Sequence, residues 1–223
     1  MEKKVSIEAV KNNPNVRLLI KNADRCMEAI GYTEHGLRHT DIVSRNAYKI
    51  LRELSYDDRT CELAAIASYL HDIGNGINRL SHPQTGALLA RDILKEMGMN
   101  CDEIIVVMSA IGNHDETYGG QPIDVVSAAT IIADKSDVHR SRVRSTEQLL
   151  FDIHDRVNYA ATSSSLNINK DKKIITLALK IDTEISQIME YFEIFLSRMI
   201  ICKKAANTLN CKFKLEINEH SLL

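Results

Sequence analysis

The sequence has few residues that interrupt helices and strands, and its cysteines show no pattern typical of disulfide bonds. Only 3 proline and 9 glycine residues occur among 223, which argues against long disordered linkers. Disulfide bonds are not expected, because the 5 cysteines are odd in number, stand apart from one another and form no CxxC pair. Isolated thiols of this kind are typical of packed, reduced side chains in a cytosol.

Long apolar runs and a strong excess of charge are also missing. No segment approaches the about 20 apolar residues that a membrane helix requires, and the charged N-terminus has no apolar run typical of a signal peptide. The formal net charge is −2, and lysine and arginine are spread along the chain, unlike the basic footprint of most nucleic-acid-binding proteins. We therefore expect a cytoplasmic protein that binds neither a membrane nor a nucleic acid polymer.

What is present indicates a helical body. A content of 44% hydrophobic and 26% charged residues is typical of globular proteins. From about residue 15 to about residue 155, apolar residues recur at helical spacing and the breaks fall at glycine, proline and asparagine. The predicted helices are 14–30, 38–54, 57–73, 82–97, 102–113 and 122–136, with a shorter helix near Glu147.

The pattern changes after Arg156. A polar turn at 167–173 separates two β-prone runs and predicts a hairpin, and a long helix is predicted at 183–210. Residues 212–218 then alternate apolar and polar side chains, as in a half-buried strand. The predicted fold class is mainly α, with residues 1–155 as a helical domain and 156–223 as a small α+β unit of β-β-α-β order.

The sequence is compatible with two roles for the C-terminal unit. It has no cluster of histidine, cysteine or acidic residues that would make a second active site. It could cover the helical domain near a substrate cleft, or it could form a homodimer by pairing an open sheet edge.

The main chemical signal is His71 followed by Asp72, directly after the apolar run 63–70. Imidazole and carboxylate together are mixed N/O ligands, which suit Fe, Mn, Zn, Co or Ni. Gly74 and Gly76 would let the backbone turn sharply beside an ion. A lone His-Asp pair is weak evidence, because the histidine can equally be an ordinary helix-end residue.

Four more residues strengthen the metal hypothesis. His39 lies on the preceding predicted helix, and Asp134 follows the apolar run 125–133, where a carboxylate is costly to bury without a cation. His82 and His114 stand where a second metal could be held. His82 and His114 could also be ordinary histidines beside an N-cap or in a loop, and Asp134 could be a helix-end aspartate that is exposed to water or paired with Lys135 or Arg140.

The order of these motifs resembles that of the HD superfamily of metal phosphohydrolases, over roughly residues 30 to 140. The residues that carry the resemblance are His39, the pair His71 and Asp72, the run from His82 to Gly86, the run from Asn113 to Glu116, and the run from Ala133 to Lys135. The resemblance implies an HD-type helical bundle in which His39, His71, Asp72 and Asp134 hold one metal. It also implies that Asp72 bridges to a second metal bound by His82 and His114.

Two branches of the superfamily are similar in different ways. The motifs around His82 and His114 resemble those of cyclic-di-GMP phosphodiesterases of the HD-GYP type, whereas the spacing and the run 132–135 resemble diadenosine tetraphosphate hydrolases of the YqeK type. The chain departs from the HD-GYP pattern at Asn75, at Asn113 and in the segment 118–122. These departures argue against cyclic-di-GMP as the substrate.

The predicted chemistry is attack on phosphorus by a metal-activated water. Asp72 would fix the separation of two divalent transition-metal ions, and Lys135 and, more weakly, Arg140 would bind phosphate. Asp115 or Asp137 is the candidate general acid, since each lies within a few residues of a proposed ligand.

Arg142 and Arg144 are left out of this catalytic set. They read at least as well as part of a solvated basic turn.

The leading functional hypothesis is a hydrolase of a small phosphorylated molecule, such as a nucleotide, a dinucleotide or a phosphomonoester. Two alternatives stay open. One is a non-catalytic regulator that binds a nucleotide on the same fold, against which the full set of ligands argues. The other is a di-iron oxygenase on the same helical scaffold.

Overall fold

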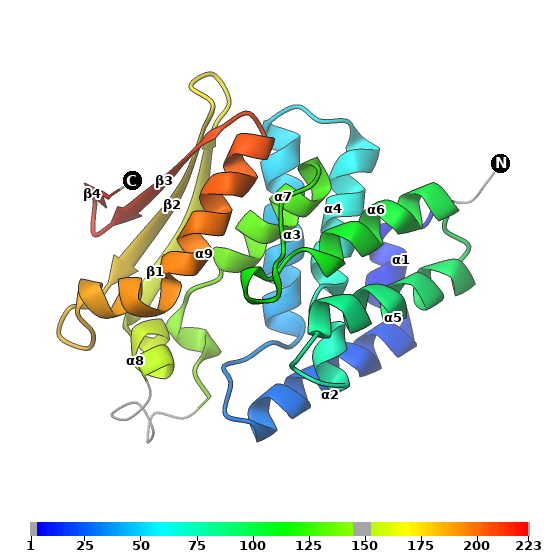
Figure 1. Ribbon diagram of the computed structural model, residues 1–223, viewed down its shortest axis with the longest axis horizontal. Helices are drawn as coiled ribbons and strands as arrows, with labels where there is room; N and C mark the ends of the chain where they lie inside the picture. The colour runs from blue at the N-terminus through cyan, green and yellow to red at the C-terminus, as the bar shows by residue number, and fades with distance from the viewer. Residues whose placement is uncertain (1–3, 145–152, 223) are drawn as a thin grey trace.

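The computed structural model describes residues 4–144 and 153–222, and it is mainly helical with a small sheet near the C-terminus (Figure 1). This arrangement confirms the predicted fold class. The helices of the first part are α1 (Ile7–Asn12), α2 (Pro14–Ala29), α3 (Leu37–Glu53), α4 (Asp58–Leu70), α5 (His82–Glu96), α6 (Cys101–Gly112) and α7 (Val125–Lys135), with 3-10 turns η1 (Ile73–Gly76), η2 (Glu116–Tyr118) and η3 (Arg140–Arg142). The second part contains α8 (Ile153–Ala160), β1 (Ala161–Asn169), β2 (Ile174–Ile181), α9 (Ile188–Thr208), β3 (Lys212–Ile217) and β4 (His220–Ser221).

Helix α4 is at the centre of the helical part. It packs against α3, α6 and α7, and every residue from Leu63 to Leu70 is buried. The side chain of Asp57 caps its first turn by accepting hydrogen bonds from the backbone N–H groups of Arg59 and Thr60. Because residues 63–70 of α4 are buried on all sides, the C-terminal end of the helix delivers the next two residues, His71 and Asp72, into the interior.

The C-terminal sheet has the order β1-β2-β3-β4. Strand β2 is antiparallel to β1 and parallel to β3, and α9 makes the crossover that this parallel pair requires. In Figure 1, α9 lies between the sheet and α7, and it contacts both α7 and β3. One hydrophobic cluster of buried side chains runs from the helical part into the sheet.

Most predicted elements are confirmed, and the differences have local causes. The predicted helix at 122–136 starts at Val125, because Asp124 and Ser127 form a capping box. The helix predicted at 183–210 starts at Ile188, where Gln187 and Glu190 form another. The helix predicted at 57–73 ends at Leu70 and gives way to η1. Helices α1 and α8 and the short strand β4 were not predicted, and the helix predicted near Glu147 lies outside the described residues.

The predicted division after residue 155 falls inside α8, and it stays a prediction. Among residues 4–144 and 153–222, no helix is both long and apolar enough to cross a membrane.

Candidate metal centre

Three elements bring the first group of donor atoms together. His39 comes from α3, His71 and Asp72 follow α4, and Asp134 belongs to α7. The Nε2 atom of His39 lies 3.4 Å from His71 Nε2 and 3.4 Å from an oxygen of Asp134, and His71 Nε2 lies 3.5 Å from the same oxygen. Asp72 Oδ2 is 3.2 Å from His71 Nε2 and 3.8 Å from His39 Nε2. The donor atoms of His39, His71 and Asp134 therefore surround a volume the size of one ion.

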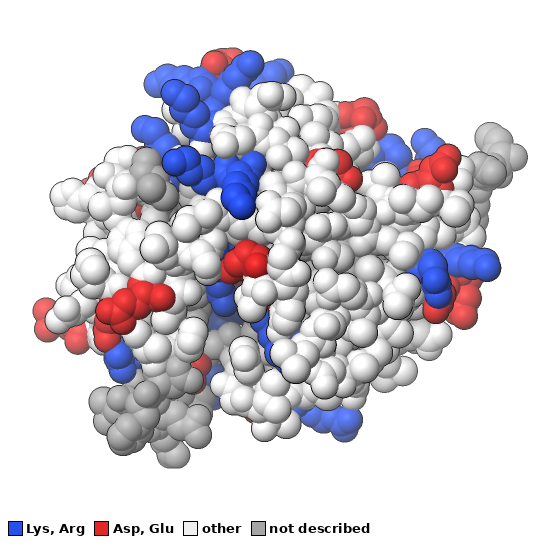
Figure 2. All heavy atoms as spheres, viewed as in Figure 1, with Lys and Arg blue, Asp and Glu red and all other residues white. Residues whose placement is uncertain are grey.

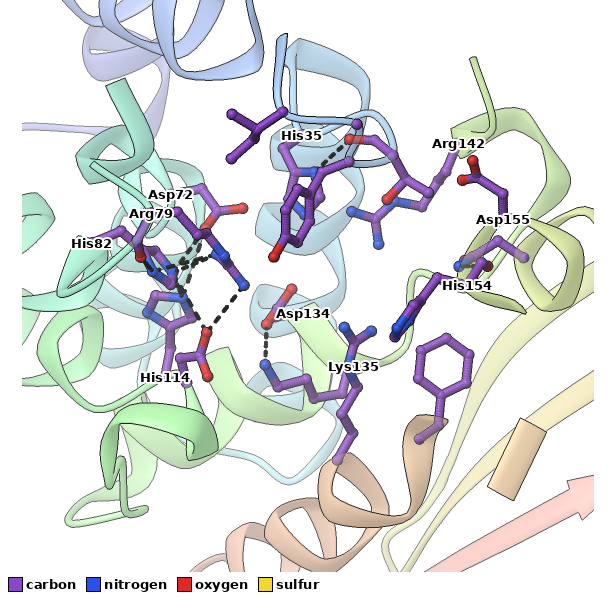
Figure 3. A pocket seen from close by; sticks show the side chains of 18 residues that line it. His35, Asp72, Arg79, His82, His114, Asp134, Lys135, Arg142, His154 and Asp155 are labelled. Atoms are coloured by element: carbon purple, nitrogen blue, oxygen red, sulfur yellow. Dashed lines mark hydrogen bonds and ion pairs between the residues drawn. The ribbon is translucent and has the colours of Figure 1, made fainter. Parts of the chain in front are cut away.

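The other oxygen of Asp72 faces a second group. Asp72 Oδ1 lies 3.4 Å from His82 Nε2 and 3.7 Å from His114 Nε2, and these two nitrogens are 3.1 Å apart. Asp115 Oδ2 is 3.6 Å from His82 Nε2. His82, His114 and Asp115 thus form a further cluster that could hold a metal, and Asp72 stands between the two clusters. Figure 3 shows Asp72 close to His82 and His114.

All four histidines present the same ring nitrogen to these clusters. Each Nδ1 atom lies 2.7 to 3.1 Å from an acceptor behind the ring, so the Nδ1–H donates there and the Nε2 lone pair points to the centre. The acceptors are Asp137 Oδ2 for His39, the Ser68 carbonyl for His71, the Ile111 carbonyl for His114 and the Arg79 carbonyl for His82.

This donor set fits a divalent cation. In each cluster the Nε2 atoms of two imidazoles converge, 3.4 Å apart in one cluster and 3.1 Å apart in the other, and a shared cation lets both lone pairs point inward. The carboxylates beside them are buried, with Asp72 and Asp115 only 4% exposed. Buried charge of this kind is costly unless it is paired or binds a metal. Imidazole nitrogen with carboxylate oxygen suits a borderline transition metal.

The electrostatics differ between the two clusters. Burial alone would lower the pKa of His71, but the carboxylates of Asp72 and Asp134 outweigh it and raise that pKa to about 10. Burial and the neighbouring imidazoles of His71 and His82 lower the pKa of His114 to about 3. Without an ion, the first cluster therefore attracts a positive charge strongly enough to hold a proton at neutral pH.

A close approach behind the clusters requires glycine at position 74. A Cβ atom there would lie 2.1 Å from the carbonyl oxygen of His82 and 2.6 Å from the backbone nitrogen of Gly86. The absence of a side chain lets η1 touch the first turn of α5, and this contact sets His82 opposite Asp72.

A cavity of about 310 Å³ opens onto the clusters. Figure 2 shows the molecule hollowed on this face, with lysine and arginine atoms visible inside the hollow. The wall nearest the clusters includes Arg79 and Lys135, and α8 closes the opposite side with His154 and Asp155 (Figure 3). Two residues of α9, Phe195 and Arg198, also line the cavity.

The proposed phosphate-binding residues lie in different places. Lys135 lines the cavity, where its ammonium group is 2.8 Å from Asp134 and 3.1 Å from Glu116. Arg140 is not among the lining residues, and its guanidinium lies over the ring of Tyr159 at 5.1 Å. The structure therefore brings Lys135, and not Arg140, to the candidate site.

The two candidate general acids differ as well. Asp115 lines the cavity, and although burial opposes ionisation, Lys135 and His114 hold its pKa at about 2. Asp137 is not among the lining residues and lies behind His39. Burial also opposes its ionisation, but the hydrogen bond from His39 and the charge of Arg142 keep its pKa below the ordinary value. An ionised carboxylate has no proton to donate at neutral pH, so the geometry supports ligand or positioning roles for both.

Sequence reasoning missed several residues of the cavity wall. His35 lines it, with Nδ1 2.6 Å from the Thr33 carbonyl, and its position four residues before His39 was the available signal. Arg79 lies between two motifs and contacts Asp115. No feature of the sequence indicated that Phe195 and Arg198 line the cavity. The apolar spacing of a helix does not show which of its residues face a site formed by distant elements.

Comparison with known proteins identifies the family of this chain. A model of the HD domain matches residues 36–160. "Uncharacterized protein MJ1020" of Methanocaldococcus jannaschii is 28% identical over 159 residues, which cover 61% of this chain and 60% of that protein. The chain thus matches about 60% of the length of this curated relative.

A solved structure is also similar. The crystal structure of a predicted HD superfamily hydrolase from an uncultured Thermotogales bacterium is 26% identical, with a TM-score of 0.44 over 59% of this chain and 73% of that one.

Proposed function

Since this chain belongs to the HD domain family, we propose that it is a metal-dependent phosphohydrolase that acts on a small phosphorylated molecule. The observation that carries the proposal is the placement of Asp72, whose two carboxylate oxygens face two separate groups of histidine nitrogens. A carboxylate in this position holds two cations at a fixed separation, which is the arrangement used to hydrolyse phosphate esters and anhydrides.

In this proposal the chain binds two ions. His39, His71 and Asp134 would hold one, and His82, His114 and Asp115 would hold the other, with Asp72 available to both. Divalent transition metals, when bound, supply Lewis acidity and a water of lowered pKa at neutral pH. The matching set of Nδ1 hydrogen bonds stabilises the tautomer that each ligand needs.

The protein groups around the clusters would bind and orient the substrate. Lys135 and Arg79 reach the cavity and place positive charge beside the proposed ions, where non-bridging phosphate oxygens would lie. Arg79 is oriented by Asp115 at 3.4 Å and by stacking on Tyr32 at 5.4 Å. A cavity of about 310 Å³ is at the small end of ligand sites, which favours a small molecule over a polymer.

Metal content and hydrolysis test the proposal together. We expect two transition-metal ions per chain by elemental mass spectrometry, and phosphate release from a panel of nucleotides, dinucleotides and p-nitrophenyl phosphate. His71→Ala and His114→Ala each remove one Nε2 ligand from a different cluster, so each should lose about one ion and at least about 100-fold in kcat. His220→Ala is the matched control, because His220 is exposed on β4.

The outcomes separate the alternatives. Absence of metal under every loading condition would overturn the proposal and favour a nucleotide-binding regulator. Two irons with dioxygen uptake and no phosphate release would favour an oxygenase. Loss of metal in His220→Ala to the same extent as in His71→Ala would show that the losses do not report on the clusters.

A further inference from the structure

Arg198 on α9 is a cation in the cavity wall that has no counter-ion among the residues the structure describes. It lines the cavity wall, and its guanidinium lies over the ring of Phe195 at 4.6 Å. Among residues 4–144 and 153–222, no carboxylate oxygen is recorded within 4.0 Å of it. Helix α9 lies outside residues 36–160, so Arg198 is not part of the HD match.

The other cations of the wall are all paired. Arg79 is 3.4 Å from Asp115, and Lys135 is within hydrogen-bonding distance of Asp134. Arg142 donates to the carbonyl of Asp137 at 2.9 Å and lies 3.7 Å from its carboxylate. These three cations already serve to hold the site together, whereas the donors of Arg198 are available to a ligand.

The position of Arg198 is fixed by its surroundings. Phe195 is 1% exposed and packs its ring against Tyr191 at 4.9 Å, which anchors the platform under the guanidinium. Helix α9 packs along α7, the helix that carries Asp134. Ser197 also donates to Glu116 at 3.3 Å, and Glu116 in turn pairs with Lys135. A partly buried arginine held this way loses little conformational entropy on binding an anion.

We infer that Arg198 binds a second phosphoryl group of the substrate, distinct from the group that is cleaved. The inference rests on the proposed function, in which the two clusters, Lys135 and Arg79 serve the scissile phosphoryl group. A guanidinium without a carboxylate partner, on a rigid aromatic platform in the same cavity, is suited to two-pronged binding of a further phosphate. The substrate class is then a molecule with at least two phosphoryl groups, and the C-terminal unit takes part in its selection.

A pair of non-hydrolysable probes tests this inference without turnover. Methylenebisphosphonate carries two phosphoryl groups and methylphosphonate carries one, and both are titrated by calorimetry into metal-loaded, desalted protein. Arg198→Met keeps the stem over Phe195 and removes the charge. We expect it to weaken methylenebisphosphonate binding about tenfold, the loss of one charge-assisted hydrogen-bonding group, and to change methylphosphonate binding less than about twofold.

Two further variants keep the result interpretable. Lys203→Met removes the same charge from an exposed position of the same helix and should bind both probes like the unchanged protein. If Arg198→Met does not fold, Arg198→Gln is measured in the same way.

An equal loss for both probes would show that Arg198 contacts the scissile group and would overturn the inference. No loss for either probe, or no binding of methylenebisphosphonate to any variant, would overturn it too. Metal content and p-nitrophenyl phosphate hydrolysis of the unchanged protein report separately on the proposed function.

Discussion

A single carboxylate, Asp137, orients one proposed ligand. It accepts a hydrogen bond from His39 Nδ1 at 2.7 Å and lies 3.0 Å from Arg38, on the side of the ring away from the clusters. The charge on Asp137 makes the imidazole a stronger donor toward a cation and fixes which nitrogen carries the proton. For His71, His82 and His114 the acceptor behind the ring is a backbone carbonyl and not a carboxylate, so the first cluster depends on Asp137 in a way the second does not.

Asp137→Asn is therefore expected to weaken metal binding at the first cluster by about 10- to 100-fold, the usual cost of changing a group behind a ligand. The asparagine keeps the shape and an acceptor oxygen but removes the charge. Competition with a chromogenic chelator measures the affinity. Asp41→Asn is the control, because Asp41 is a partly exposed residue of α3 that pairs with Lys11, and it should leave the affinity unchanged. Equal affinities in Asp137→Asn and the unchanged protein would contradict the orienting role.

The proposed ligands could be found from the sequence because their residue types and order carry the chemistry. The role of Asp137 could not, because its position near Asp134 is compatible with either side of a ligand. Only the packing of α3 against α7 shows that it lies behind His39. Arg198 was out of reach for the same reason, since it joins the site only through the packing of α9 on α7.

One charged side chain links the N-terminal turns of α4 and α6. Arg59 on α4 donates to both carboxylate oxygens of Glu103 on α6, at 2.6 and 2.5 Å, and it also contacts Glu62 and the carbonyl of Val5. The two-pronged pairing lowers the pKa of Glu103, against the opposing effect of burial. This link holds the helix that delivers His71 against the helix that precedes His114.

The pairing predicts a pH-dependent contribution to stability. A carboxyl group whose pKa is lowered by folding stabilises the native state above its unfolded pKa, about 4.3 for glutamate, and this contribution is lost as the pH falls through the folded value. Glu103→Gln should therefore reduce the free energy of unfolding by about 1 kcal/mol at pH 7, a modest figure because the pair is partly exposed. The difference should shrink as the pH falls below about 4 and vanish below the folded pKa of Glu103.

Urea unfolding at several pH values measures it. Glu96→Gln, an exposed change on α5, should show no such trend. A difference between Glu103→Gln and the unchanged protein that stays constant from pH 7 to pH 3 would contradict the electrostatic origin.

Helix positions were predictable because apolar periodicity reports directly on burial. Their exact starts were not, since they depend on which side chain captures the free N–H groups. In α7 the side chain of Asp124 does so, and in α9 the side chain of Glu190 accepts from the backbone N–H of Gln187; both helices start after the first residue of the predicted helix. Short elements such as α1 and α8 are stabilised mainly by packing against the rest of the chain, and local pattern alone does not reveal them.

The helical part and the sheet share one hydrophobic interior. Helix α9 contacts α7 on one side and β3 on the other, so apolar side chains of the sheet belong to the same cluster as those of α4. The free edge of β1 is also contacted by the helical part, where Lys49 donates to the Leu166 carbonyl and Ser164 to that of Ser136. A homodimer formed through an open sheet edge stays a prediction, and the edge of β1 is poorly suited to it.

A shared interior predicts that the sheet and the helices unfold together. Leu177 on β2 is 1% exposed, and Leu177→Ala should lower the free energy of unfolding by about 2 to 5 kcal/mol, the usual cost of such a cavity. Circular dichroism at 222 nm reports mainly on α1 to α7, which do not contain the mutation. If the interior is shared, the whole helical signal should move to lower urea concentration in one transition.

Ser165→Ala is the control in the same sheet, because Ser165 is exposed on the outer face of β1, and it should change the free energy by less than about 0.5 kcal/mol. A biphasic curve in which most of the helical signal keeps its original midpoint would instead show that residues 1–155 and 156–223 are independent units. In that case α9 could detach from α7 without loss of the helical fold, and the selection of substrate by Arg198 would depend on docking of the C-terminal unit. A single shifted transition would mean that α9, which carries Arg198, stays packed beside the candidate metal centre as long as the helical part is folded.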